Sequence, residues 1–480
     1  MGSVIKKKKT REKCQIFTPT NIVKLMLDHL GYSHDLYGKT ILENSCGDGQ
    51  FLKEIVKRYI LDCEKRGFTS EKIYDGLSHD IYGIELDPVQ YKKCIEGLNT
   101  LTDSHKIRRV CWQIKQADAL RKPYSLLFDY VVGNPPYVSY WDLDSSERKF
   151  VEKNFTTCTF GTWDYSYAFI QDGLNHLNPS GRMAYIVPNS IFKTKAGINV
   201  RTLLRPYITE ILDYTTTNVF ENVLTSPAIL VIDKASQSNQ VTYCDLSKEI
   251  CNVLKRATLE DVWVFGRQEH AGDGAHRFGD YFHVATSVAT QCNDVFVLKG
   301  WTDTGEYLCN GDDRIEKAAT RNAASPRGKA YNVCEHIIFP YYYDGGKLKH
   351  YTEDSFKKKF PYAFAYLDRQ RKRLKKRDAD KSSQWFEYGR SQALTQINQK
   401  KLLLSTVITD EVRIYKLKDA EVPYSGLFIT AIDREDALSL DTAIAILTSK
   451  EFMEEIVRFG INARGKSVRI VAKNLLDYRW

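Results

Sequence analysis

The first half of the chain alternates short runs of β-branched and apolar residues with longer segments in which apolar positions recur at helical spacing. The short runs predict strands at residues 40–43, 81–86, 110–116, 130–132, 183–187, 211–214 and 228–232. Strands that alternate with helices usually form a mostly parallel sheet with helices on both faces. We therefore expect a doubly wound α/β fold in this half of the chain.

The second half lacks this alternation. Glycine, tyrosine and charged residues are interspersed there, and the strands that the pattern predicts are short and irregular. Between the halves, serine, asparagine and glutamine replace the apolar runs at residues 234–240, which is typical of a linker. We expect one domain at residues 1–236 and an irregular, mixed α+β domain at residues 241–480.

Length and composition support two domains and exclude two classes of protein. The 480 residues exceed the roughly 100 to 200 of one domain. The hydrophobic fraction of 43% is enough for packed cores, which excludes a disordered chain. No window approaches the roughly 20 apolar residues of a membrane span, and the lysine-rich start does not resemble a secretory signal. We expect a cytoplasmic protein without a membrane partner.

The eleven cysteines contain no CxxC pair of the kind that builds zinc or redox sites. We expect them to be free thiols, mostly buried, in a reducing compartment. Cys334 and His336 lie two residues apart, but no other ligand-type residue clusters with them. The sequence therefore predicts no metal site.

The net charge is +9, from 69 lysines and arginines against 60 acidic residues, and a dense block of it lies in the second half. No proline or glycine interrupts this basic segment (residues 369–377), so we expect it to lie on a helix at residues 363–377. Such a run is usually a solvated helix face. A nucleic-acid backbone is the alternative, because clustered cations repel one another unless an anion is near. The seven cations are Arg369, Arg371, Lys372, Arg373, Lys375, Lys376 and Arg377.

A glycine-containing turn follows the first predicted strand. Glu43 ends that strand, Gly47 and Gly49 lie in the turn, and an amphipathic helix begins near Gln50. Glycines at the carboxyl edge of such a sheet let the backbone approach a nucleoside closely. A tight connection between strand and helix would use the same residues without any ligand.

Acidic residues end the next two predicted strands. The carboxylate of Glu85 can accept hydrogen bonds from both hydroxyls of a ribose, and Asp87 nearby reads as a solvated residue or helix cap. Asp118 can accept a hydrogen bond from the amine of an adenine, but a helix cap explains it equally well.

The predicted strand at residues 130–132 leads into the NPPY motif, which consists of Asn134, Pro135, Pro136 and Tyr137. The exocyclic amine of adenine is a poor nucleophile because its lone pair is delocalised into the ring. The Asn134 side-chain oxygen and the Pro135 carbonyl can each accept one hydrogen of that amine, which localises the lone pair. The prolines stiffen the loop, and Tyr137 would stack on the base, a contact worth roughly 1 to 3 kcal/mol. A rigid Asn-Pro turn is the alternative without chemistry.

Together the motifs resemble the gamma-class DNA adenine-N6 methyltransferases of restriction-modification systems, the group with a TaqI-like C-terminal specificity domain. Residues 181–190 resemble the fifth-strand signature of that family. Residues 338–342, the basic segment, and residues 445–450 and 465–469 resemble its specificity domain. The motifs follow the family's order, which is Phe17-Thr18-Pro19, the glycine turn, Glu85, Asp118 and the NPPY motif.

The resemblance implies a Rossmann-like, S-adenosylmethionine-dependent methyltransferase fold, a catalytic NPPY motif, S-adenosyl-L-methionine as cofactor and no required metal. Glu85 would hold the ribose and Asp118 the adenine amine, while residues 17–19 would close over the methionine end. Thr18 and Pro19 also read as an ordinary helix start, cap and first position. The residues implied to bind the cofactor are Phe17, Thr18, Pro19, Glu43, Asn44, Cys46, Gly47, Gly49, Glu85, Leu86, Asp118, Ala119 and Asn134.

Three features depart from the family's pattern. Asn44 stands where the family often has proline, and residues 66–79 read as an insertion. The strand at residues 226–233 contains none of the aromatic residues that some members supply for the flipped base. Phe220 and Tyr165 are the candidates for that second stacking surface.

We therefore expect a site-specific DNA adenine-N6 methyltransferase that flips an adenine out of duplex DNA and transfers the methyl group directly. Its partner would be double-stranded DNA, and any cognate restriction endonuclease would be a separate protein. We expect the protein to be a monomer. We also expect it to be of prokaryotic type and to associate with the nucleoid. Two alternatives stay open: methylation of RNA or of a protein glutamine by the same motif, and a non-catalytic DNA-specificity subunit.

Overall fold

The computed structural model describes residues 17–121, 126–215, 219–220, 226–265, 275–434, 436–462 and 467–480. The chain divides into two compact units, Met1–Gly266 with Ile461–Lys466, and Arg267–Gly460 with Ser467–Trp480. The domain boundary expected at residues 236–241 is therefore wrong. Strands β8 (Gln240–Asp245) and β9 (Ile250–Lys255) follow that stretch and continue the sheet of the first unit.

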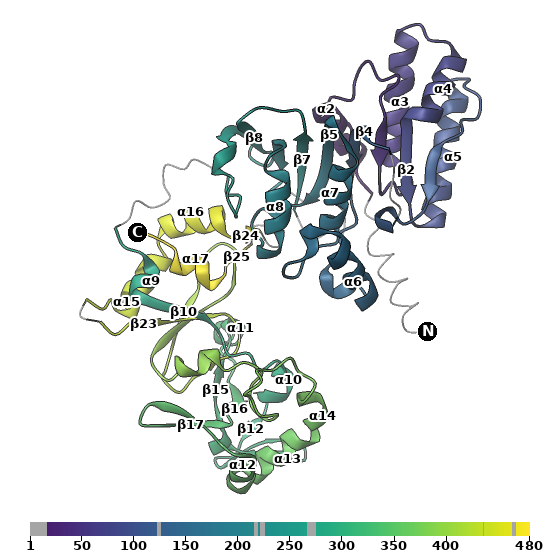
Figure 1. Ribbon diagram of the computed structural model, residues 1–480. Helices are drawn as coiled ribbons and strands as arrows, with labels where there is room; N and C mark the ends of the chain where they lie inside the picture. Colours follow the sequence, from purple (N-terminus) through teal and green to yellow (C-terminus); the bar gives the residue numbers. More distant parts are fainter. Residues whose placement is uncertain are drawn as a thin grey trace. The chain divides into compact units, whose positions relative to one another are not determined.

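Within the described residues, the first unit is built on a nine-stranded sheet in the order β3-β2-β1-β4-β5-β7-β6-β8-β9 (Figure 1). The strands from β3 to β5 in this order are parallel, and β7 runs antiparallel to both of its neighbours. All seven strands expected from the hydrophobic pattern are present. They are β1 (Ile41–Glu43), β2 (Ile81–Glu85), β3 (Gln113–Gln116), β4 (Phe128–Gly133), β5 (Leu177–Pro188), β6 (Ile208–Asp213) and β7 (Pro227–Asp233).

Two hydrophobic clusters cover the two faces of this sheet, because successive residues of a strand point to opposite faces. Ile41 packs in the cluster that contains α2 to α5, whereas its neighbour Leu42 packs in the cluster that contains α6 to α8. The doubly wound arrangement is thereby confirmed, and α4 lies in the stretch read as an insertion. The helices are α2 (Thr20–Leu30), α3 (Gln50–Lys65), α4 (Ser70–Asp80), α5 (Pro88–Ser104), α6 (Ser145–Asn154), α7 (Ser166–Asn175) and α8 (Ile198–Leu204).

The cysteines correct one expectation. Cys244 of β8 and Cys251 of β9 are directly opposed in the antiparallel pair, with Cα atoms 4.1 Å apart, and form a disulfide. The pairing follows from strand register, which the spacing of the cysteines does not reveal. Cys14 lies outside the described residues. The free cysteines of the described part are Cys46, Cys63, Cys94, Cys111, Cys158, Cys292, Cys309 and Cys334.

Among the described residues, the two large hydrophobic cores of the second unit are each built on a four-stranded sheet. Helices α9 (Phe278–Tyr281), α15 (Leu440–Leu447), α16 (Lys450–Phe459) and α17 (Ala472–Leu476) pack on the first sheet. That sheet has the order β10 (Phe282–Thr286), β23 (Leu427–Ala431), β19 (Lys401–Leu404) and β21 (Ile414–Leu417). The second sheet has the order β11 (Val297–Lys299), β16 (Glu335–Ile338), β15 (Thr320–Ala324) and β22 (Val422–Pro423).

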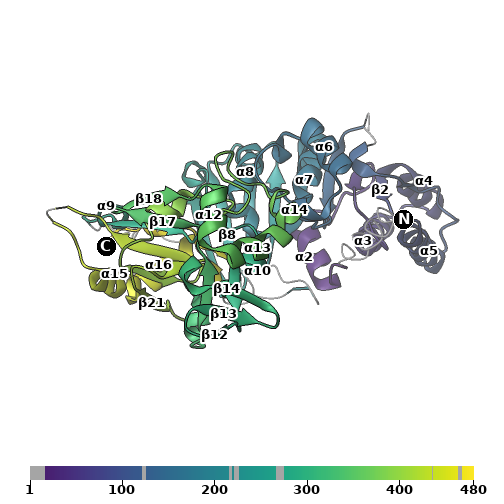
Figure 2. The same ribbon diagram turned by 90° about the horizontal axis from the view of Figure 1, so that it is seen from below.

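Short strands and helices complete the second unit and confirm its irregular α+β character. Figure 2 shows the small sheet of β12 (Thr302–Asp303), β13 (Tyr307–Asn310) and β14 (Asp313–Glu316), with α13 (Pro361–Arg369) packed on β14. The other elements are β17 (Tyr341–Asp344), β18 (Lys347–His350), α10 (Asn293–Phe296), α11 (Pro326–Ala330), α12 (Glu353–Lys359), β20 (Val407–Ile408) and β25 (Val468–Arg469). In the described part of the chain, no helix is long and apolar enough to cross a membrane.

The basic segment does not lie on one helix. Helix α13 ends at Arg369, and a separate short helix, α14 (Arg371–Leu374), follows after Gln370, so the helix expected at residues 363–377 is wrong. A continuous helix would stack like charges three and four residues apart, which is unfavourable. The break lets the Arg371 guanidinium pair with the carboxylates of Asp368 and Glu353 instead.

Candidate active site

The parallel pairing of β2, β1 and β4 places their carboxyl ends at one edge of the sheet. Leu42 of β1 is in register with Tyr82 of β2 and with Val131 of β4. Glu43, Glu85 and the NPPY motif, which follow these positions, therefore leave the sheet side by side. This carboxyl edge is where open α/β sheets bind nucleosides.

Hydrogen bonds to Glu85 hold the glycine turn at this edge. One carboxylate oxygen of Glu85 accepts from the Gly47 N–H at 2.8 Å, and the other accepts from the Asp87 N–H at 2.6 Å. Burial raises the pKa of Glu85, and these two N–H groups oppose that rise. A carboxylate oxygen can accept a second hydrogen bond, so Glu85 keeps capacity for a ligand hydroxyl.

The two glycines of the turn serve different purposes. Both have a positive φ, +54° at Gly47 and +85° at Gly49, a region that favours glycine. A Cβ at Gly47 would meet no described residue within 4 Å, so the backbone is open on that side within the described part of the chain. A Cβ at Gly49 would lie 2.7 Å from the Cys94 sulfur, so Gly49 is needed for packing of the turn against α5.

Glu43, the last residue of β1, has a buried carboxylate. Glu43 is 2% exposed, and one of its carboxylate oxygens has no hydrogen-bond partner among the described residues. Burial raises its pKa, and the neighbouring Cys94 and Glu85 add to that rise. Buried polar atoms are almost always paired, so this oxygen suits a donor from a ligand.

The Asn44 side chain is fully used inside the protein. Its amide nitrogen donates to Asp172 of α7 at 2.9 Å, and its oxygen accepts from the Tyr185 hydroxyl at 2.7 Å. Asn44 therefore ties β1 to β5 and α7, and only its backbone is available to a cofactor.

The remaining cofactor residues at this edge differ in exposure. Cys46 is buried, and a hydrogen bond with Cys94 together with burial raises its pKa, so it stays a neutral thiol. Leu86, beside Glu85, is 47% exposed and presents an apolar surface that suits a planar base. Ala119 is buried in the core beneath Asp118.

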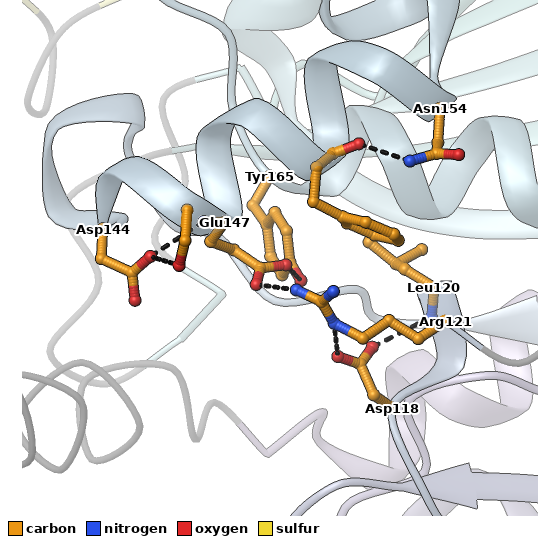
Figure 3. A network of polar contacts seen from close by, with 9 residues as sticks. Asp118, Leu120, Arg121, Asp144, Glu147, Asn154 and Tyr165 are labelled. Carbon is orange, nitrogen blue, oxygen red and sulfur yellow. Dashed lines mark hydrogen bonds and ion pairs between the residues drawn. The ribbon is translucent and has the colours of Figure 1, made fainter.

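Asp118 carries out the helix-cap role and also pairs with a cation (Figure 3). One oxygen accepts from the Leu120 N–H at 3.1 Å and caps the 3-10 turn of Ala119–Arg121. The other accepts from the Arg121 guanidinium at 3.0 Å. A ligand amine at Asp118 must therefore share the carboxylate with Arg121.

Thr18 meets the NPPY motif. The Asn134 amide nitrogen donates to the Thr18 hydroxyl at 3.1 Å, and Thr18 is 5% exposed. Thr18 is not the helix cap, because α2 begins at Thr20 with Pro19 as its N-cap. The contact joins residues 116 positions apart and fixes the rotation of the Asn134 amide. Phe17 lies outside the helix and is 49% exposed.

Tyr137 is anchored, with Phe220 beside it. Its hydroxyl donates to the Ile186 carbonyl at 2.9 Å, and the Phe220 ring centre lies 6.5 Å from its own at an interplanar angle of 69°. The Tyr165 hydroxyl donates instead to Glu147 at 3.0 Å. Of the two aromatic candidates, Phe220 is the one that contacts Tyr137.

Sequence reasoning missed Asp164, a carboxyl group close to the NPPY motif. It accepts from the Ser166 N–H at 2.9 Å, and its residue bridges to Ser139. Burial raises its pKa to about 6. An aspartate just before a helix reads as a cap in sequence, so only the fold reveals this burial.

Four of the seven cations of the basic segment have partners inside the second unit. Arg369 pairs with Asp313, Arg373 pairs with Asp294 at 2.6 Å, and Arg371 pairs as described above. Arg377 is half-buried and donates to the carbonyls of Leu374, Thr290, Trp385 and Glu387. The other three cations, Lys372, Lys375 and Lys376, are exposed and form no ion pair with a described residue.

Comparison with known proteins places this geometry in a family. The model of the N-6 DNA Methylase family matches residues 4–264, more than half of the chain. The chain belongs to the N-6 DNA methylase family. The methyltransferase fold expected from the sequence is therefore confirmed, and DNA methylation at N6 is the chemistry of this chain.

Individual relatives are distant. The chain is 25% identical to the Type II methyltransferase M.BstVI of Geobacillus stearothermophilus, over 97% of this chain and 89% of the relative. It is 23% identical to the Type II restriction enzyme and methyltransferase RM.Eco57I of Escherichia coli, over 95% of this chain and 56% of the relative. The fold is similar to that of the Type IIL restriction-modification enzyme MmeI in complex with DNA, at TM-score 0.61 and 14% identity, over 96% of this chain and 64% of the other.

Replacing each glycine of the turn by alanine distinguishes the cost of backbone strain from the cost of overpacking. A left-handed backbone costs an L-residue roughly 1 to 2 kcal/mol, and overpacking adds about 1 to 3 kcal/mol. We expect Gly49→Ala to lower the free energy of unfolding by about 2 to 5 kcal/mol, and Gly47→Ala by about 1 to 2 kcal/mol. Urea unfolding measures both, and equal losses would contradict the packing role given to Gly49.

Asp164 makes stability depend on pH. Its folded pKa of about 6 lies above the ordinary value of 3.8, so the folded state holds the proton to higher pH than the unfolded chain. Stability is therefore lost as pH rises from about 4 to about 6. Relative to wild type, Asp164→Asn should become more stable over this interval by about 1 to 3 kcal/mol. A difference that stays constant with pH, as expected for the exposed control Asp142→Asn, would refute this.

Proposed function

We propose that the chain is a site-specific, adenine-specific DNA methyltransferase that uses S-adenosyl-L-methionine. The observation that carries this proposal is the NPPY motif at the end of β4, next to the edge formed by Glu43, Gly47 and Glu85. Asn134 and the prolines supply acceptors for a planar amine, and the neighbouring edge has the features of a nucleoside site.

The residues of the edge fit the proposed cofactor. Glu85 would hold the ribose hydroxyls, and Leu86 would lie against the adenine ring, with Asp118 accepting from its amine. The open backbone at Gly47 and the unpaired oxygen of Glu43 leave room and an acceptor at the methionine part. S-adenosylmethionine supplies a methyl group on a sulfonium centre, which is electrophilic enough for direct transfer.

The protein's part in the reaction is to place the target amine. The Asn134 side-chain oxygen and the Pro135 carbonyl accept the two hydrogens of adenine N6, which localises the nitrogen lone pair toward the methyl group. Tyr137, held by its bond to Ile186, would stack on the flipped base. No residue needs to remove a proton before the attack, and one is lost from the amine after transfer.

The second unit is proposed to bind the DNA backbone. Flipping a base costs a few kcal/mol, which contacts to phosphates must offset. Lys372, Lys375 and Lys376 are exposed, and none of them forms an ion pair with another described residue. The names of the relatives support a place in a restriction-modification system.

The first test is methyl transfer by an Asn134→Ala variant. Loss of one pre-positioned acceptor should reduce the transfer of labelled methyl to duplex DNA by about 100- to 1000-fold. Cofactor affinity, measured by calorimetry, should change by less than about tenfold. Asn154→Ala on the exposed end of α6 is the matched control and should keep full activity. Transfer that survives in Asn134→Ala, or label found in RNA or protein while DNA stays inert, would refute the proposal.

The three unpaired lysines give a second test. If each contacts one phosphate, replacing all three by alanine should reduce the salt dependence of DNA binding by a slope of about 2 to 3. Affinity should weaken by about 10- to 100-fold without a change in cofactor binding. Fluorescence anisotropy across salt concentrations measures both quantities. The control replaces Lys65, Lys92 and Lys93 on α3 and α5, and an equal loss in the control would show that only net charge matters.

A further inference from the structure

A series of polar contacts leads from Asp118 through Arg121 and Glu147 to Tyr165 (Figure 3), and from there to the residue that follows the NPPY motif. Arg121 pairs with Asp118 at 3.0 Å and also with Glu147 of α6. Glu147 accepts from the Tyr165 hydroxyl at 3.0 Å on its other oxygen. The backbone N–H of Tyr165 donates to the carbonyl of Val138 at 2.9 Å, and Val138 directly follows Tyr137.

Arg121 is the central residue of this series of contacts. Its guanidinium lies between two carboxylates that would otherwise repel each other, and it stacks on the Phe150 ring at 3.9 Å from the ring centre. The stacking keeps the planar group from swinging into solvent, because it covers one face of it. The pKa of Arg121 is raised by Glu147 and Asp118 against the opposing effect of burial, so both carboxylates favour the charged guanidinium.

The contacts at the other end of this series, around Glu147 and Tyr165, are also held in place. Glu147 is held in the first turn of α6, because its N–H donates to the N-cap Asp144 at 2.8 Å. Beyond Tyr165, Asp164 bridges to Ser139, so two adjacent residues hold the segment that follows the NPPY motif. A displacement of Glu147 therefore reaches the backbone that carries Tyr137.

We propose that Arg121 is a positioning residue that couples occupation of the cofactor's adenine site to the placement of the NPPY motif. A ligand amine at Asp118 shares the oxygen that now binds Arg121, which shifts the guanidinium toward Glu147. The strengthened pair with Glu147 holds Tyr165, and through Val138 it restrains the loop. This proposal rests on the proposed function in one respect, which is that Asp118 binds the cofactor.

Coupling of this kind is reciprocal, so the cofactor should also favour binding of the target base. Hydrogen exchange of the amides at residues 137–141 reports the loop directly, with S-adenosylhomocysteine as the probe and no reaction required. We expect the probe to slow exchange there by about tenfold in wild type and by less than about twofold in Arg121→Met.

Two conservative substitutions distinguish a loss of coupling from a general loss of structure. Tyr165→Phe removes one hydroxyl and Glu147→Gln one charge, and both should lose the probe's effect on exchange while binding the probe within about threefold of wild type. Lys149→Met is the matched control, since Lys149 lies on α6 beside this network and is exposed. It should behave as wild type.

The kinetic test compares the change in KM for DNA with the change in kcat. Arg121→Met should raise KM for DNA by about 5- to 20-fold, with a smaller change in cofactor affinity. Protection of residues 137–141 in Arg121→Met equal to that in wild type would overturn the proposal, even in an enzyme that methylates DNA normally. Protection that depends on Arg121 would uphold it even if the wild-type chain left DNA unmethylated, which would count against the proposed function alone.

Discussion

The parallel pairing of β1 with β2 on one side and β4 on the other is the constraint on which the rest of the site depends. Their register brings Glu43, Glu85 and Asn134 to a single edge, although 91 positions separate the first from the last. The bond from the Gly47 N–H to Glu85 then closes the turn over that edge. If β1 slipped by one residue, its buried faces would exchange and the cofactor groups would separate from the NPPY motif.

The parts of the fold that were predicted correctly are those with a local signal. Strands that are buried on both faces read as continuous apolar runs, and β7 and the second half of β5 show this clearly. The domain boundary was wrong because the polar stretch at residues 234–240 connects β7 to β8 within the first unit. A polar connection between two strands of one sheet has the same composition as a linker between domains.

The site was predicted where one motif holds the chemistry and missed where distant residues combine. Gly47 and Glu85 were found from the ends of strands. The contact of Thr18 with Asn134 was not, because nothing in the sequence marks two residues so far apart as neighbours. The basic segment shows the same limit, since Asp294 and Asp313 neutralise two of its arginines from other elements of the second unit. Charge density alone cannot separate cations that are available from cations that are used.

The central claim is that this site transfers methyl groups to adenine N6 in DNA at one recognition sequence. The most direct measurement is to express the chain in a host without DNA methylation and to map N6-methyladenine across the genome. The account predicts N6-methyladenine at every copy of a single short motif and nowhere else. A genome without N6-methyladenine, from cells that contain the folded protein and S-adenosylmethionine, would contradict it.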